Sequence, residues 1–197
     1  SSEHERTPFN EIKISNEDKE KILEISRKDD LISLMQNSIA PSVFATGVMH
    51  YVKRSLSLQL FGGVSRINQD KTRTRGDIHI LLMSDPGVAK SQVLNYMSKI
   101  SPRGKLASGG GVSGAGLTAA AVRDAFGDGR FALEAGVLPL SDRGLAAIDE
   151  FDKISEDDRK VMHPAMEQQQ INVAKGGITA TLPSRCAILA AANPKDG

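Results

Sequence analysis

The chain has a single cysteine, no tryptophan and no long apolar run, and each shortage excludes a class of protein. Cys186 alone cannot form an internal disulfide, and no Cys/His cluster offers a zinc site, so the composition favours a reducing, intracellular compartment. No apolar stretch approaches the roughly 18–20 residues that a membrane span needs, and the polar start does not resemble a secretory signal. We therefore expect no membrane partner and no zinc in this sequence.

The chain also has few aromatic residues and almost no net charge. Only 4% of the residues are aromatic, which argues against a base-stacking platform for nucleic acid. Lys and Arg number 25 against 24 Asp and Glu, so the net charge of +1 excludes a strongly basic coat, and any contact with nucleic acid must be local. What is present is apolar material, 40% of 197 residues, which is enough for one large soluble domain.

The first third of the chain has the apolar spacing of helices. Residues 16–37 fit two short helices broken near Asp29, and a further helix begins near Val48 and stops at Gly62. The polar and basic stretch 65–77 is interpreted as an exposed loop.

From Ile78 onward, apolar strands alternate with helices. The predicted buried strands have the sequences IHILLM, LAAI and RCAILAAAN, and helices are expected over residues 89–99 and 156–168. This alternation is typical of an α/β protein with a parallel sheet and helices on both faces. Turn signals around Asp128 and Lys175 predict two β-hairpins in addition.

Three residues within these elements carry expectations of their own. Pro164 is expected to kink or shorten its helix. His79 lies in an apolar strand with no second metal ligand at suitable spacing, so it is expected to be a satisfied core side chain. Cys186 is expected to be a small buried residue.

The loop after the first predicted strand has the character of a phosphate-binding loop. In SDPGVAKS, backbone N–H groups and a helix N-terminus would surround a β-phosphate, Lys90 would reach the β- and γ-oxygens, and the Ser91 hydroxyl would hold Mg²⁺. The general pattern G-x-x-x-x-G-K-[ST] is not met, because Ser84 and Ala89 stand where its outer glycines belong and only Gly87 remains. An ordinary strand-to-helix turn with a solvated lysine therefore stays open.

Polar side chains follow two more of the predicted strands. Asp149 and Glu150 end the strand LAAI, where Asp149 would hold Mg²⁺ through water and Glu150 would orient or deprotonate the water that attacks a γ-phosphate. Asn193 ends the last strand, where its amide would hydrogen-bond the γ-phosphate and that water. Each has a simpler explanation, a helix-capping turn or an Asn-Pro strand end. Their order on successive strand ends nevertheless favours an ATP and Mg²⁺ site.

Several segments together are similar to the ATPase domain of the minichromosome maintenance (MCM) replicative helicases, a branch of the AAA+ P-loop NTPases. The matching segments are GDIHILLMSDPGVAKSQ, GAGLTAAAVRD, LEAGVLPLSDRGLAAIDEFDK, MEQQQINVAKGGITATLPSRC and AILAAANP, with NSIAPSVF and LFGGV upstream. In that family alanine before the lysine is usual, so Ala89 fits, whereas Ser84 replaces the usual glycine. The resemblance implies the AAA+ fold with two inserted β-hairpins.

The resemblance also implies a role for each site residue. Lys90 and Ser91 would be the Walker A pair, Asp149 and Glu150 the Walker B pair, and Asn193 the sensor-1 amide, with Mg²⁺ held by Ser91 and Asp149. The nucleotide-binding loop would comprise Ser84, Asp85, Pro86, Gly87, Val88, Ala89, Lys90, Ser91 and Gln92.

Further regions acquire roles by the same resemblance. The segment Ile39 to Phe44 would pass beside the adenine. The hairpin around Asp128 resembles the helix-2 insertion, and the other resembles the pre-sensor-1 hairpin, both of which project into the channel of a hexamer in the family. Lys175 would then meet the DNA backbone as a point charge, whereas without the resemblance it is a solvated turn lysine.

The implied function is that of a truncated ATPase module of a replicative DNA helicase, with DNA and other MCM subunits of a hexamer as partners. Residues 1–76 would form a helical lead-in and residues 77–197 an ATPase core that ends after sensor 1, before any arginine finger, so ATP hydrolysis by this piece alone is expected to be poor. The location would be the nucleus of a eukaryote, or the cytoplasm and nucleoid of an archaeon. Two alternatives stay open: a regulatory or degenerate AAA+ subunit without efficient turnover, and a protein-remodelling AAA+ ATPase.

Overall fold

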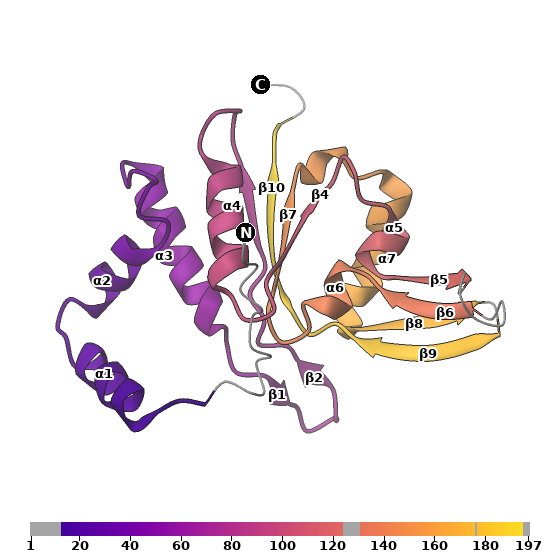
Figure 1. Cartoon of the computed structure of the whole chain (residues 1–197), viewed down its shortest axis with the longest axis horizontal. Coiled ribbons are helices and arrows are strands. Elements are labelled where there is room, and N and C mark those ends of the chain that lie inside the picture. Colours follow the sequence, from indigo (N-terminus) through magenta and orange to yellow (C-terminus); the bar gives the residue numbers. More distant parts are fainter. Residues whose placement is uncertain (1–12, 124–130, 176, 195–197) are drawn as a thin grey trace, which may run out of the picture. The chain divides into compact units, whose positions relative to one another are not determined.

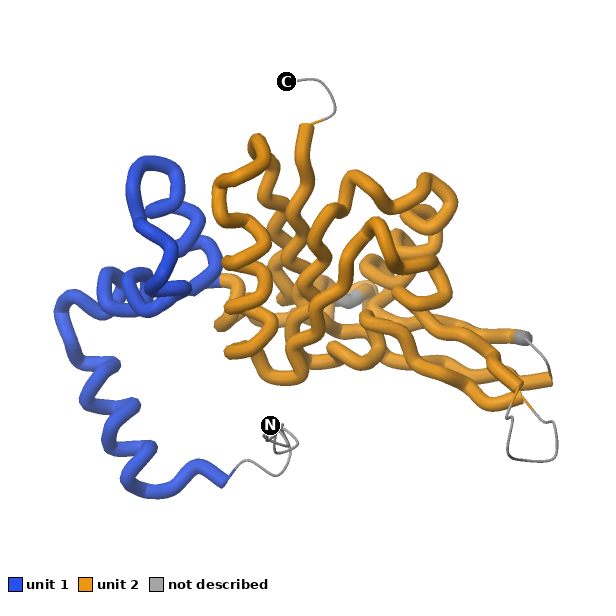
Figure 2. Tube along the Cα trace, turned by 45° about the horizontal axis from the view of Figure 1, so that its top comes forward, with its two compact units in different colours: residues 1–58 blue, residues 59–197 orange. Residues whose placement is uncertain are grey.

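A computed structural model describes residues 13–123, 131–175 and 177–194 of the chain. The chain divides into two compact units, residues 1–58 and 59–197, which are coloured separately in Figure 2. The sequence analysis places the domain boundary after residue 76, and that boundary stays a prediction.

The first unit is helical. Its elements are α1 (Asn16–Ser26), α2 (Leu31–Ser38) and the larger part of α3 (Val48–Phe61). A capping box starts α1, because the Ser15 hydroxyl accepts from the Asp18 N–H and the Asp18 carboxylate accepts from the Ser15 N–H, each at 3.1 Å. The predicted pair of short helices and the end of the third helix before Gly62 are confirmed.

The second unit is built on four parallel strands in the order β3-β10-β7-β4 (Figure 1). The strands are β3 (Ile80–Met83), β4 (Lys105–Ser108), β7 (Leu145–Asp149) and β10 (Ala187–Ala192). The two central strands, β7 and β10, are almost wholly buried, as their continuous small and branched apolar residues predict. Because all four strands run the same way, their carboxyl ends meet at one edge of the sheet.

Helices cover both faces of this sheet, as the alternation of strands and helices predicts (Figure 1). Helix α4 (Lys90–Ile100) lies on one face and buries Val93, Leu94 and Met97 completely. On the other face lie α5 (Gly114–Leu117), α6 (Val137–Leu140) and α7 (Glu156–Gln168), where Met162 packs in one apolar cluster with Ile148 of β7. The expected α/β P-loop architecture is therefore confirmed.

Two β-hairpins extend from the same side of the sheet (Figure 1). Strand β5 (Ala119–Arg123) pairs antiparallel with β6 (Phe131–Ala135), and β8 (Gln170–Lys175) pairs with β9 (Ile178–Pro183). Both predicted hairpins are confirmed by this pairing. The turn residues Asp128 and Gly129 lie outside the described residues, as does residue 176.

Two sequence predictions about strands are wrong, and one strand was missed. The expected loop 65–77 contains a two-stranded pair, β1 (Arg66–Ile67) and β2 (Arg73–Thr74), whose turn is closed by the Asp70 carboxylate accepting from the Thr72 N–H at 2.9 Å. Strand β4 was not predicted, because KLAS has no apolar pattern and gains its partners only from β7. Strand β3 was expected to be buried, but it is an edge strand whose Leu81 is 51% exposed.

The expectations for single residues have mixed outcomes. The α7 helix continues through Pro164 to Gln168, so it is not shortened there. Burial raises the pKa of the Cys186 thiol to about 12, in keeping with a small core residue. His79 Nδ1 accepts from the Ile188 N–H at 3.1 Å, but within the described residues its buried Nε2 has no partner, so His79 is only half satisfied.

Among the described residues, no helix combines the length and the apolar character that crossing a bilayer requires.

Candidate active site

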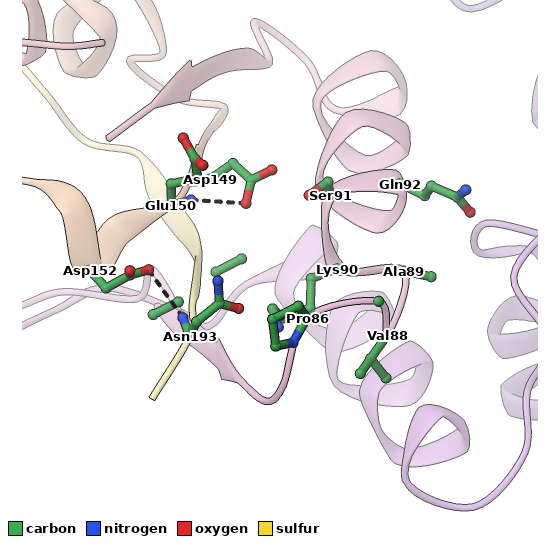
Figure 3. A pocket seen from close by; sticks show the side chains of 13 residues that line it. Pro86, Val88, Ala89, Lys90, Ser91, Gln92, Asp149, Glu150, Asp152 and Asn193 are labelled. Atoms are coloured by element: carbon green, nitrogen blue, oxygen red, sulfur yellow. Dashed lines mark hydrogen bonds between the residues drawn. The ribbon is translucent and has the colours of Figure 1, made fainter. Parts of the chain in front are cut away.

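A pocket of about 430 Å³ lies at the carboxyl ends of β3, β7 and β10, within the second unit (Figure 3). This is where ligands bind in open parallel sheets, because the strand ends and the following loops leave a crevice there. The lining residues are Pro86, Gly87, Val88, Ala89, Lys90, Ser91, Gln92, Asp149, Glu150, Asp152, Ala191, Ala192 and Asn193. The structure thus brings together the loop, the acid pair and the amide that the sequence analysis singled out.

The loop between β3 and α4 has the backbone of an anion cradle. Gly87 takes a φ of 89°, and Ala89 takes the left-handed conformation, φ 57°, directly before α4 begins at Lys90. The free N–H groups of the first helical turn and the helix dipole therefore face the pocket, where they favour a bound phosphate. A left-handed alanine costs about 1–2 kcal/mol relative to ordinary backbone, which a well-determined loop can carry.

The Lys90 side chain is held by the start of its own loop. Its Nζ donates to the Ser84 carbonyl oxygen, to the Ser84 hydroxyl at 3.0 Å and to the Asp85 carbonyl oxygen at 2.9 Å. Ser84 is not among the residues with positive φ, so a side chain is tolerated at the position where the family usually has glycine. Ser84 and Asp85 thus act on the pocket through Lys90, since neither is among its lining residues.

The acid pair stands across the pocket from α4. Asp149 ends β7, and its Oδ1 accepts from the Glu150 N–H at 2.9 Å, which orients the Asp149 carboxylate. Figure 3 shows Ser91 on α4 and Asp149 on β7 on opposite walls of the same pocket. A hydroxyl and a carboxylate are oxygen ligands of the kind Mg²⁺ takes, with phosphate and water completing its shell, so these two residues fit that ion.

The Glu150 carboxylate is held from two sides. Its Oε2 accepts from the Ser108 hydroxyl at 2.8 Å and its Oε1 pairs with Lys153 Nζ. The hydrogen bond from Lys153, and after it the one from Ser108, lowers the pKa of Glu150 below its ordinary value. Glu150 itself adopts φ 50°, a strained left-handed conformation. These two hydrogen bonds therefore orient the carboxylate and stabilise its ionised form.

Asn193 completes the arrangement from β10. Its side-chain amide points into the pocket, between the acid pair and Lys90 (Figure 3). Its backbone N–H donates to Asp152 Oδ1 at 3.0 Å, which ties the end of β10 to the turn that follows β7. An ammonium, a hydroxyl, two carboxylates and an amide thus converge on one space.

Comparison with known proteins identifies the family of the chain. The family model described as the MCM P-loop domain matches residues 18–197. The chain belongs to the MCM family. The sequence resemblance and the expected fold class are thereby confirmed.

Relatives of this MCM chain come from archaea and eukaryotes. It is 47% identical over 190 residues to the minichromosome maintenance protein MCM of Saccharolobus solfataricus, which covers 96% of the chain and 27% of that protein. It is 49% identical over 172 residues to the DNA replication licensing factor mcm5 of Dictyostelium discoideum, covering 87% of the chain and 22% of that protein. It is 47% identical over 193 residues to the DNA replication licensing factor mcm7 of Schizosaccharomyces pombe, covering 98% of the chain and 24% of that protein. The chain spans about a quarter of the length of these relatives.

The structure adds four residues to the MCM site that sequence reasoning missed: Ser108, Gly109, Asp152 and Lys153. Gly109 follows β4 and donates its N–H to the Asp149 carbonyl oxygen at 2.8 Å, and a Cβ there would overlap the Glu150 carbonyl oxygen. A glycine run directly after a polar strand was the signal for Ser108 and Gly109. Asp152 and Lys153 gave the weaker signal of charges in a short turn after the acid pair.

Two other predicted positions are not among the residues that line this pocket. Strand β8 ends at Lys175, paired with Ile178, in the second hairpin. The segment from Ile39 to Phe44 belongs to the first unit. The DNA contact of Lys175 and the adenine contact of that segment stay predictions.

Proposed function

We propose that this chain is the nucleotide-hydrolysing part of an MCM-type DNA helicase, which binds ATP with Mg²⁺ and cleaves the γ-phosphate. One observation supports this most strongly: Lys90, Ser91, Asp149, Glu150 and Asn193, which arise from three different strand ends, line the same pocket. Phosphoryl transfer requires little covalent chemistry from a protein and depends mainly on positioning and charge. The five side chains supply the groups that such positioning uses.

Each side chain has a separate task in this proposal. Lys90 turns from the loop oxygens to the β- and γ-phosphate oxygens, and the α4 N-terminus holds the β-phosphate. Ser91 and Asp149 would hold Mg²⁺, which neutralises the charge that develops on the phosphates. Glu150 accepts a proton from the attacking water through its ionised carboxylate, which the hydrogen bonds from Ser108 and Lys153 hold in place. Asn193 donates from its amide to the γ-phosphate and aligns the water.

Two substitutions separate binding from cleavage. In the natural protein that carries this sequence, Lys90→Ala is expected to abolish ATP binding, because the only cation in the loop is lost. Glu150→Gln is expected to leave ATP binding intact and to lower turnover by about a hundredfold or more, because general-base catalysis is removed. Lys99→Ala, at the other end of α4, is the matched control and should change neither property. Intact turnover in Glu150→Gln would contradict the proposal.

The charges of the pocket support an assembly of subunits. Among the described side chains that line the pocket, Lys90 is basic, whereas Asp149, Glu150 and Asp152 are acidic. A triphosphate with Mg²⁺ in these surroundings keeps excess negative charge, which a cation from a neighbouring subunit would offset, with an effect of about 10³–10⁵ on rate. We propose that the neighbours are other MCM subunits of a hexamer. Turnover by the isolated chain is accordingly expected to be low.

The proposed role on DNA depends on the second hairpin. A lysine at the end of β8 would contact phosphates as a point charge and would carry no sequence preference. Stimulation of ATP hydrolysis by DNA should therefore be lost in Lys175→Ala and kept in Lys105→Ala, a lysine of the edge strand β4. Indifference of the unmodified protein to DNA would instead favour a protein-remodelling ATPase.

The second candidate is a regulatory or degenerate subunit that binds ATP without efficient turnover. The observation that favours it is Ser84, whose hydroxyl occupies one donor of Lys90. Tight ATP binding with no DNA-stimulated hydrolysis in a complete assembly would support this candidate over the helicase. For either role we propose an intracellular location where the DNA lies, the nucleus of a eukaryote or the cytoplasm and nucleoid of an archaeon.

A further inference from the structure

Asp152 occupies an unusual place between two of the proposed catalytic groups. It lies in the short 3-10 turn Phe151–Lys153, directly after Glu150, and it lines the pocket. Its Oδ1 accepts from the backbone N–H of Asn193 at 3.0 Å, a bond that Figure 3 shows from the side of the pocket. Apart from its contribution to the charge of the pocket, none of the roles proposed above uses this carboxylate.

The position of Asn193 in its strand explains why such a bond matters. The pairing of β10 with β3 ends at Ala192, and its pairing with β7 ends at Ala190, so Asn193 is the first residue beyond the ladder. Asn193 therefore has no ladder pairing to fix the position of its backbone. The carboxylate of Asp152 supplies the acceptor that the sheet does not.

We propose that Asp152 is a positioning residue that fixes the side-chain amide of Asn193 at a set distance from the Glu150 carboxylate. Asp152 follows the base Glu150, which is the N-cap of this turn, by two residues. Its hydrogen bond from the Asn193 N–H therefore links the backbone that carries the amide to the backbone that carries the base. Catalytic groups must be held within about 0.5 Å of their productive geometry, and a 1 Å error costs on the order of a hundredfold in rate. This inference rests on the proposed ATP hydrolysis.

A positioning role and a charge role for Asp152 require different properties of its side chain. As an acceptor for one N–H, the side chain needs an oxygen at the place of Oδ1, and asparagine in the same rotamer offers one. As a ligand of Mg²⁺ or a second proton acceptor, the side chain would need its negative charge, which asparagine lacks. Substitution by asparagine and by alanine therefore distinguishes the two.

The experiment measures kcat and KM for ATP in the natural protein that carries this sequence. Asp152→Ala is expected to lower kcat about tenfold and to change KM less than about twofold, because the amide is misplaced while the phosphate loop is intact. Asp152→Asn is expected to keep kcat within about threefold of the unmodified protein, because the acceptor remains. Asp157→Ala, an exposed carboxylate on α7, is the matched control and should leave both constants unchanged.

A double-mutant cycle tests whether Asp152 acts through Asn193. In the background of Asn193→Ala, the further change Asp152→Ala should alter kcat less than about twofold, because there is no amide left to position. Full additivity of the two effects, or an Asp152→Asn variant as inactive as Asp152→Ala, would overturn the inference. ATP binding and the unfolding temperature of each variant are measured alongside, which separates a misplaced amide from a damaged fold.

The experiments also distinguish a failure of this inference from a failure of the proposed function. If the unmodified protein binds no ATP, or Glu150→Gln retains turnover, the proposed function itself fails. If those controls behave as expected and the cycle is additive, only the positioning role of Asp152 fails.

Discussion

Removing the Ser84 hydroxyl should tighten ATP binding. In the structure, Lys90 Nζ donates to the Ser84 hydroxyl at 3.0 Å, a bond that the ammonium must give up when it turns to the phosphate oxygens. Ser84→Ala removes this bond from the free state and removes nothing from the ATP complex. A partly buried hydrogen bond is worth about 1 kcal/mol net, so the Kd for ATP should fall about fivefold.

The assay is isothermal titration calorimetry with ATP and Mg²⁺, and two further variants give it controls. Ser84→Thr keeps the hydroxyl and should leave the Kd unchanged. Ser84→Gly removes the hydroxyl but frees the backbone of the loop, so it should gain less affinity than Ser84→Ala. A higher Kd for Ser84→Ala would show that the hydroxyl contacts the nucleotide, and an unchanged Kd would show that its bond to Lys90 persists in the complex. Either result would refute the reasoning.

Two further predictions concern the base and its support. The hydrogen bond from Lys153 holds the pKa of Glu150 below its ordinary value, so this pKa should rise in Lys153→Ala and the acidic limb of the pH profile of kcat should move to higher pH. In Lys153→Arg the acidic limb should stay at its original pH, because the donor is kept. An unmoved limb in Lys153→Ala would contradict the assignment of Glu150 as the base. Gly109→Ala places a Cβ against the Glu150 carbonyl oxygen, so it should lower the free energy of unfolding by about 1–3 kcal/mol. The unfolding temperature measured by calorimetry should then fall by about 2–10 °C. An unchanged temperature would show that the ends of β4 and β7 separate freely.

Much of the second unit could be predicted because its sequence pattern and its packing agree. Strands β7 and β10 are continuous apolar runs, and such runs are buried wherever they lie in a parallel sheet. Strand β4 has no such pattern and exists because β7 offers it a partner, which local sequence does not reveal. The β1 and β2 pair likewise depends on a turn closed by Asp70, made of polar residues that equally suit a loop.

The candidate site also contains residues that could be predicted from the sequence and residues that could not. Lys90, Asp149 and Asn193 could be predicted to converge, since each follows a strand and the carboxyl ends of parallel strands meet. The partners of those residues could not, because Ser108 and Glu150 are 42 positions apart and Asp152 and Asn193 are 41 apart. Such contacts follow from the order of strands in the sheet rather than from any motif.

The most direct test of the account is an experimental structure of the natural protein with Mg²⁺ and a non-hydrolysable ATP analogue. The account predicts that the γ-phosphate lies between Lys90 Nζ and the Asn193 amide, with the metal ion on the side of Ser91 and Asp149. A triphosphate bound away from the ends of β7 and β10 would contradict it.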